Sequence, residues 1–170
     1  MPIDRLRNPK QSPKGPRSLK ARAIALLARR EYSRAELRSR LAANDGGGAG
    51  DVAEIDVVLD ELAAQGYLSN ARYAQAVVRQ KSGGYSKRAI VETLKARGVT
   101  GADAVDALAD GGIDDQDALV ALWRRRFGKP PADDREKARQ VRFLQSRGFA
   151  LSAIFRLLRN PPVDADTPGT

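Results

Sequence analysis

Residues 31–41 read EYSRAELRSRL, and residues 84–94 read GYSKRAIVETL. Both stretches carry Tyr, Ser and a basic residue in the same order, and two large aliphatic residues follow at matching offsets. Ser is a preferred helix N-cap, and an apolar residue before the cap packs on another in the first turns of the helix. In the first copy, Ser33 and Glu36 also have the spacing of a capping box. The chain contains one helix start twice, which predicts a repeated helical unit.

The end of this helix is repeated as well. Residues 95–99 read KARGV and residues 145–149 read QSRGF, so a Gly and an apolar residue follow each helix. Gly at this position adopts the left-handed conformation that ends a helix, and the apolar residue anchors the turn. Asp133 and Glu136, upstream of the last copy, form another capping-box pattern. One helix therefore recurs three times, at a spacing of about 50 residues.

Helical patterns fill the remainder of the chain between its two ends. The further helices are expected at residues 19–30, 52–65, 70–81 and 115–127, and after caps at Thr100 and Ser152. These patterns predict an all-α fold, an elongated array of three tandem three-helix repeats. We expect a disordered basic Pro-rich tail at 1–17, repeats at 18–68, 69–112 and 113–159, a Gly-rich insertion at 44–51, and a disordered tail at 160–170.

Composition argues against several classes of protein. The chain has no Cys and no His, which removes thiolate chemistry, the commonest general base and the commonest zinc ligand. The Gly-rich insertion follows no strand and lacks the Gly-Lys-Ser/Thr of a phosphate-binding loop. The acidic run at 112–117 is explained by the preference of acids for helix starts. We therefore expect no enzyme activity, no cofactor and no metal.

The N-terminal segment and the hydropathy pattern bear on location. Residues 1–20 are basic but have no apolar stretch of the kind found in secretory signals, and no apolar run approaches the length of a membrane span. We expect a cytoplasmic protein that does not interact with membranes, and a monomer.

Acidic and basic residues alternate in blocks, and the net charge is +9. Residues 45–61 and 103–117 carry only acidic charges, whereas residues 62–97 and 124–159 are mainly basic. Long blocks of one sign exceed what helix solvation requires and favour a basic surface that binds a polyanion or an acidic protein. The residues expected to contact a partner or DNA are Arg72, Arg79, Lys81, Lys87, Arg88, Lys95, Arg97, Arg139 and Arg142.

Aromatic residues stand beside basic ones at three places, around Tyr32, Tyr73 and Tyr85. Aromatic rings next to cations can stack on unpaired bases. Tyr32 and Tyr85 are already explained as apolar residues before a helix cap, however, and Tyr73 lies on the apolar face of its helix. Packing is therefore the preferred interpretation of all three rings.

Four segments together resemble the RecX family, and the match runs in order from about residue 19 to residue 159. They are REYSRAELRSRL at 30–41, VLDELAAQGYLSNARYA at 58–74, GGYSKRAIVETLKARGV at 83–99 and KARQVRFLQSRGF at 137–149. The resemblance implies an all-helical array of three-helix repeats that binds the filament of the RecA recombinase and restrains it in DNA repair. Two features depart from the family pattern: the Gly-rich insertion in the first repeat, and Ser69 and Asn70 where the family tends to be acidic.

Two other functions fit the same residues. Short helix pairs joined by Gly turns resemble helix-turn-helix units, so the chain could be a stand-alone module that binds single- or double-stranded DNA. The acidic helices could instead hold a basic protein partner, in a purely structural adaptor.

Overall fold

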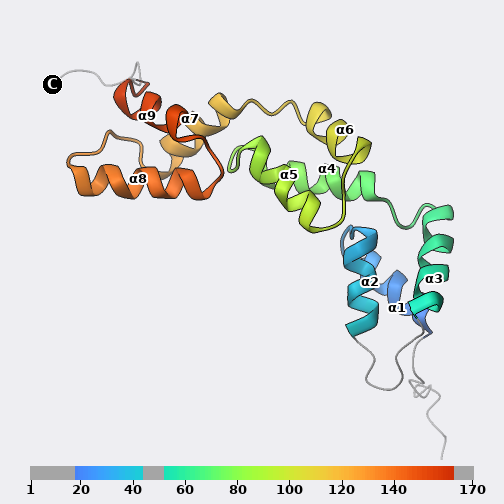
Figure 1. Ribbon diagram of the computed structural model, residues 1–170. Helices are drawn as coiled ribbons and strands as arrows, with labels where there is room; N and C mark the ends of the chain where they lie inside the picture. The colour runs from blue at the N-terminus through green and yellow to red at the C-terminus, as the bar shows by residue number, and fades with distance from the viewer. Residues whose placement is uncertain (1–17, 44–51, 163–170) are drawn as a thin grey trace, which may run out of the picture.

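The structure is a computed structural model that describes residues 18–43 and 52–162. Within these ranges it contains helices and turns but no strand. The helices are α1 (Leu19–Leu27), α2 (Arg34–Ala43), α3 (Val52–Ala64), α4 (Asn70–Lys81), α5 (Lys87–Ala96), α6 (Ala102–Asp110), α7 (Asp115–Arg126), α8 (Asp134–Ser146) and α9 (Leu151–Arg159). Figure 1 shows them arranged as a bent, elongated array in chain order.

Three separate hydrophobic cores divide this array into units. Helices α1–α3 enclose the first core around Leu37, Leu41 and Leu59. Helices α4–α6 form the second core, and helices α7–α9 the third, which contains Trp123 and Leu144. Each core is built from the helices of one unit, as in other repeat proteins. The prediction of an all-α array of three-helix repeats is confirmed.

The repeated helix starts form as the sequence predicts. The Ser86 hydroxyl accepts a hydrogen bond from the amide of Ala89 at 3.2 Å, and the Ser33 hydroxyl accepts one from the amide of Glu36 at 3.1 Å. Tyr32 is buried in the first core, and Tyr85 packs against the second. Both rings therefore have the packing role that was preferred over base stacking.

Two expected caps are wrong. Helix α6 begins after Gly101 rather than Thr100, because Gly101 has φ +67°, a conformation that Gly adopts readily and Thr does not. Helix α9 begins after Ala150, whose backbone already has extended cap geometry, so Ser152 lies inside the first turn.

The Gly turns after α5 and α8 adopt the predicted left-handed form, with φ +71° at Gly98 and +90° at Gly148. In each turn the next amide reaches back five residues, from Val99 to the Leu94 carbonyl at 2.9 Å and from Phe149 to the Leu144 carbonyl at 3.4 Å. Val99 and Phe149 are both buried. This geometry is that of a Schellman motif, and it fixes the direction in which the chain leaves each helix.

The predictions for residues 1–17, for the insertion at 44–51 and for most of the tail at 160–170 lie outside the described residues. None of the helices in residues 18–43 and 52–162 is long and apolar enough to cross a membrane.

Candidate functional site

The turn after α5 lies against the start of α2, and we call this contact the first junction. The Ser33 hydroxyl donates a hydrogen bond to the backbone carbonyl of Arg97 at 2.6 Å, while it caps α2. At Gly98 the two units approach so closely that an added Cβ would lie 2.8 Å from the Cβ of Ala35. The second unit is therefore seated on the helix start of the first.

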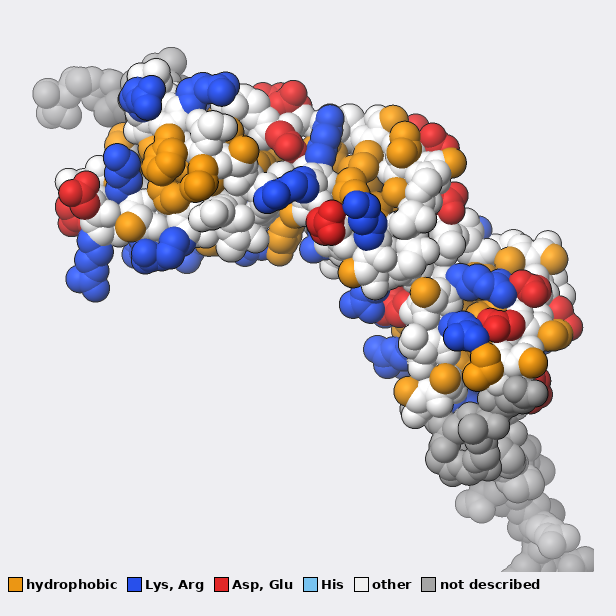
Figure 2. Space-filling view, in the orientation of Figure 1, with side chains coloured by type: hydrophobic (Ala, Val, Ile, Leu, Met, Phe, Trp, Pro, Cys, Tyr) orange, Lys and Arg blue, Asp and Glu red, His pale blue; other side chains and the backbone are white. Residues whose placement is uncertain are grey.

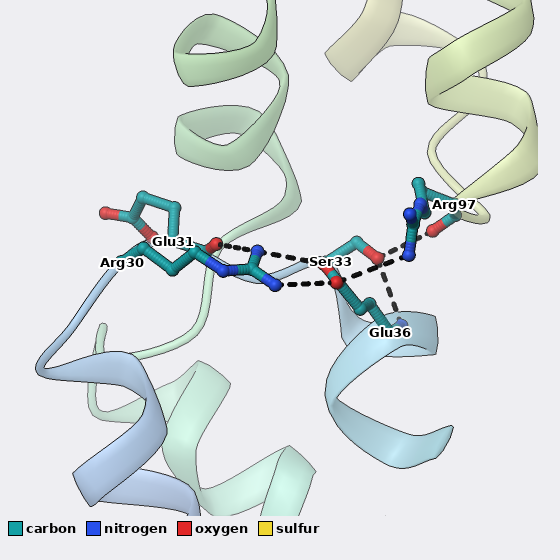
Figure 3. Close-up of polar contacts among 5 residues, drawn as sticks. All are labelled: Arg30, Glu31, Ser33, Glu36 and Arg97. Atoms are coloured by element: carbon teal, nitrogen blue, oxygen red, sulfur yellow. Dashed lines mark hydrogen bonds and ion pairs between the residues drawn. The ribbon is translucent and has the colours of Figure 1, made fainter. Parts of the chain in front are cut away.

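Glu36 lies at the centre of the first junction, as Figure 3 shows. Its carboxylate accepts from the Arg30 guanidinium at 2.7 Å and forms an ion pair with Arg97 at 3.3 Å. The side chain is only 9% exposed, and the hydrogen bond from Arg30, with the charges of Arg30, Arg97 and Arg40, lowers the pKa of this carboxyl below its ordinary value. The predicted capping box is thus half formed. The Ser33 hydroxyl accepts a hydrogen bond from the Glu36 amide, but the Glu36 carboxylate pairs with arginines instead of accepting from the Ser33 amide.

Two further contacts tie α4 to the first unit. The amide of Arg34, the first residue of α2, donates to the Asn70 side chain at 2.9 Å. The Arg72 guanidinium donates to Glu31 at 2.9 Å and to the carbonyl of Tyr67 at 3.0 Å. The Asn70 side chain therefore acts as a hydrogen-bond acceptor, a role that an acidic residue would also fill.

The second junction joins the turn after α8 to the start of α5, and it repeats the first. The Ser86 amide donates to the carbonyl of Arg147 at 3.0 Å, and the Lys87 amide donates to the Asp115 carboxylate at 2.7 Å. An added Cβ on Gly148 would lie 2.5 Å from the Ser86 hydroxyl and 2.6 Å from the Cβ of Ala89. The helix start that the sequence contains twice is thus the seat for the Gly turn of the following unit.

The two junctions differ in how the arginine before the Gly turn is held. Ala89 in α5 occupies the place that Glu36 has in α2, so the second junction has no carboxylate there. The guanidinium of Arg147 donates instead to the Tyr85 hydroxyl, and it lies 4.7 Å from the Tyr85 ring centroid and 5.1 Å from that of Phe143. Here an arginine is held by aromatic rings rather than by an acid.

Beside the second junction lies a groove of about 610 Å³, which we call the central groove. The side chains that define it are Lys81, Tyr85, Arg125, Arg126, Phe143 and Arg147. Lys81 lies 4.1 Å from the Tyr85 ring centroid, and Arg125 donates to the Gly83 carbonyl at 3.4 Å. No acidic residue is among the described residues that line the groove.

The hollow at the first junction has a similar size but a different charge. It encloses about 620 Å³ and is lined by Arg30, Arg40 and Arg97 together with Glu36. The Glu36 carboxylate already pairs with two of these arginines. Of the two hollows, only the central groove presents cations without a carboxylate among them.

The structure distributes the sequence-predicted contact residues over several environments. Arg72 and Arg97 form ion pairs at the first junction, Lys95 pairs with Glu92, and only Lys81 lines the central groove. Figure 2 shows Lys and Arg side chains on all three units of one face, with Asp and Glu interspersed. Because both signs of charge are mixed on this face, net charge does not locate a binding site, and a local cluster of basic side chains is needed to identify one.

The other predicted contact residues lie outside the central groove. Arg139 and Arg142 line a separate hollow on α8 together with Asp133 and Glu136. Arg79, Lys87 and Arg88 are exposed on α4 and α5. Whether these residues contact a partner stays a prediction.

Sequence reasoning missed Arg125, Arg126 and Arg147 as members of one cluster. Arg125 and Arg126 were part of a long basic block, and Arg147 of a helix end. The signal that could have found Arg147 was the repeat itself, because Ala89 at the position of Glu36 leaves the arginine before the Gly turn without its acidic partner.

The chain matches two family models, namely "RecX, second three-helix domain" over residues 69–108 and "RecX, third three-helix domain" over residues 114–158. The matched ranges correspond to α4–α6 and to α7–α9. A protein named Regulatory protein RecX from Leptothrix cholodnii is 46% identical over 142 residues, which cover 84% of this chain and 88% of that protein. Another of that name from Ralstonia nicotianae is 39% identical over 160 residues, covering 92% and 98%.

A solved structure shares the fold. The crystal structure of RecX from Lactobacillus salivarius matches with a TM-score of 0.59 at 19% identity, covering 83% of this chain and 94% of that one. The domain models, the relatives and the repeated helix starts agree with the resemblance seen in the sequence, and the chain belongs to the RecX family.

Proposed function

We propose that this chain is a non-enzymatic regulator that binds the filament of the RecA recombinase and inhibits its ATP hydrolysis, strand exchange and filament extension during DNA repair. The names of its relatives support a regulatory role. We further propose that it acts in the cytoplasm, as a monomer.

The observation that carries this proposal is the end-to-end array of three units joined at two similar junctions. Hydrogen bonds to the carbonyls of Arg97 and Arg147 hold successive units in a defined bend. An elongated, curved repeat protein presents a long surface that can lie in the groove of a helical polymer and bridge neighbouring protomers. A single small domain of the same charge would reach one protomer only.

Such a regulator needs no covalent chemistry. A protein that binds one filament geometry better than another shifts the equilibrium toward the geometry it prefers, by no more than its difference in affinity. If the preferred geometry is incompatible with ATP turnover or with addition of protomers, both activities fall together.

The test is to measure ATP hydrolysis by RecA on single-stranded DNA, and filament length by electron microscopy, as the concentration of this chain increases. We expect turnover to fall to a plateau and filaments to stop lengthening. Unchanged turnover and length at saturating protein would contradict the proposal.

A stand-alone nucleic-acid-binding module is the second candidate, and the central groove favours it because cations line the groove without an acid. Binding of single- or double-stranded DNA by the chain alone, with no effect on RecA, would support this candidate over the first.

A further inference from the structure

We propose that the central groove between the second and third units binds the phosphodiester backbone of a nucleic acid, without regard to base sequence. This inference does not rest on the regulation of RecA. It rests on the second candidate function and deepens it, because it names the site and the chemistry of the ligand. The site is not the basic strip expected from the sequence, with which it shares only Lys81.

The charge of the groove is the first argument. Lys81, Arg125, Arg126 and Arg147 line it, and no carboxylate is among its described lining residues. At the first junction Arg97, which corresponds to Arg147, lies 3.3 Å from the Glu36 carboxylate, and Glu36 also pairs with Arg30 at 2.7 Å. Like charges gathered without a counter-charge repel one another, so an anion that enters the central groove relieves that repulsion.

The rings in the groove orient these cations. Lys81 and Arg147 both lie over the Tyr85 ring, and Arg126 and Arg147 lie 5.7 and 5.1 Å from the Phe143 ring centroid. Cation–π contacts of this kind restrict long side chains before a ligand arrives, which reduces the entropy lost on binding. Because the cations already occupy positions over both rings, the groove is suited to holding a backbone rather than stacking bases.

The kind of side chain favours phosphate. Three of the four cations are arginines, whose planar, weakly hydrated guanidinium donates two parallel hydrogen bonds to one phosphate. A groove of about 610 Å³ accommodates a short stretch of chain rather than one small ion. An acidic peptide offers the same charges through flexible side chains, and it is the alternative that the experiment must distinguish.

The site is also built from two units. Lys81 and Tyr85 belong to the second unit, whereas Arg125, Arg126 and Arg147 belong to the third. The cations therefore converge only while the Gly148 turn stays seated on Ser86 and Ala89. Binding should depend on the second junction and not on the first.

The first experiment measures the salt dependence of binding of the full chain to a mixed-sequence single-stranded oligonucleotide, by fluorescence anisotropy and without RecA. The double variant R125Q/R126Q should lower the slope of log K against log salt by about 1.4, the value for two lost phosphate contacts. Between 50 and 200 mM salt the wild type then loses roughly sevenfold more affinity than the variant. The matched control R156Q/R159Q removes the same charge from exposed positions of α9 outside the groove and should leave the slope unchanged.

The second experiment compares G148A with G98A. Both substitutions strain a left-handed Gly and push units apart, but only G148A disturbs the junction beside the groove. G148A should weaken oligonucleotide binding, whereas G98A should not. R125Q/R126Q keeps the proposal testable if G148A does not fold, because those two side chains are exposed.

Three results would overturn the proposal. The slope could fall in R156Q/R159Q but not in R125Q/R126Q, or G98A and G148A could affect binding equally. The third is that polyglutamate of the same charge competes for the groove at least as well as the oligonucleotide, which would identify an acidic protein segment as the ligand. Loss of RecA regulation has no bearing on these measurements, since RecA is absent from them.

Discussion

At the scale of single residues, one carboxylate neutralises the arginines of the first junction. Glu36 is nearly buried, and it pairs with Arg30 from its own unit and Arg97 from the next. Its lowered pKa means that the ionised Glu36 carboxylate is more stable in the folded protein than in the unfolded chain, so this charge stabilises the fold. This stabilisation is complete above the ordinary carboxyl pKa of about 4.5, and it is lost as pH falls toward the lowered value in the folded state.

We expect Glu36→Gln to lower the free energy of unfolding by about 1–2 kcal/mol at pH 7, because the charged hydrogen bond and both ion pairs are lost. The difference from wild type should be constant above pH 5.5 and should shrink below about 4.5. Urea denaturation at a series of pH values measures this. Glu92→Gln is the control, since Glu92 is exposed and pairs only with Lys95. Equal effects of the two substitutions would refute the role assigned to Glu36.

A second residue-scale contact lies inside the third core. The indole of Trp123 donates to the Gln140 side chain at 2.9 Å, and Gln140 in turn donates to the Lys129 carbonyl at 3.4 Å. Gln140 and Trp123 are both buried. A polar side chain in a core is tolerated when its hydrogen bonds are made, and here it links α7, α8 and the loop between them.

Gln140→Leu should cost about 2 kcal/mol of stability, because it leaves the buried indole N–H without an acceptor. The change also alters the surroundings of the only Trp in the chain, so its fluorescence reports the same event. Gln145→Leu, at an exposed position of the same helix, should change stability by less than about 0.5 kcal/mol. If the two variants unfold at the same urea concentration, the bond contributes nothing measurable.

At the scale of helices, the start of α2 and the start of α5 each serve two units. Ser33 caps α2 and also donates to Arg97, and the amides of Arg34 and Lys87 donate to side chains at the first residues of α4 and α7. Helix starts expose unpaired amides, and here the next unit supplies acceptors for them. The repeated sequence thus encodes a connector as well as a helix.

Ser33→Ala should therefore cost more than the loss of an ordinary cap. We expect about 2 kcal/mol, because the part-buried hydrogen bond to the Arg97 carbonyl is lost in addition to the cap. Ser69→Ala, which removes a cap from α4 without crossing a junction, should cost about 1 kcal/mol. Thermal and chemical denaturation of both variants measure the difference, and similar costs would mean that the contact between units adds no stability.

At the scale of the whole molecule, the bend of the array depends on close approach at two glycines. Gly98 and Gly148 have left-handed backbones, and an added Cβ at either would meet the neighbouring unit at less than 3 Å. Gly101 has the same backbone handedness, but an added Cβ there meets nothing within 4 Å. Substitution at Gly101 therefore strains the backbone alone, whereas substitution at Gly98 also displaces a unit.

On the proposed function, Gly98→Ala should raise the concentration needed for half-inhibition of RecA by about tenfold, or about 1.4 kcal/mol of binding. Gly101→Ala should have a clearly smaller effect at similar folded stability. Solution X-ray scattering of each variant would show whether the array has changed its bend. A change of bend with full inhibition would indicate that regulation does not depend on the relative placement of the first two units.

Local order could be predicted well from the sequence. The helices, the caps at Ser33, Ser86 and Asp133 and the left-handed turns at Gly98 and Gly148 follow from residues within a few positions of one another. The caps expected at Thr100 and Ser152 were wrong because neighbouring Gly101 and Ala150 already supply the required backbone geometry. A Ser, Thr or Asp predicts the start of a helix reliably only where no adjacent residue can take the cap position instead.

The sequence by itself determined an all-helical chain of three similar units in the RecX family, because helix periodicity, caps and Gly turns act over one or two turns of backbone. Only the tertiary structure decided which charges meet. Ser33 reaches Arg97 across 64 residues, and Arg147 reaches Tyr85 across 62. Such pairs depend on how one unit is seated on the next, and the charge blocks along the chain do not contain that geometry. For this reason Glu36 neutralises the arginines of one junction, while the cations of the other line an open groove.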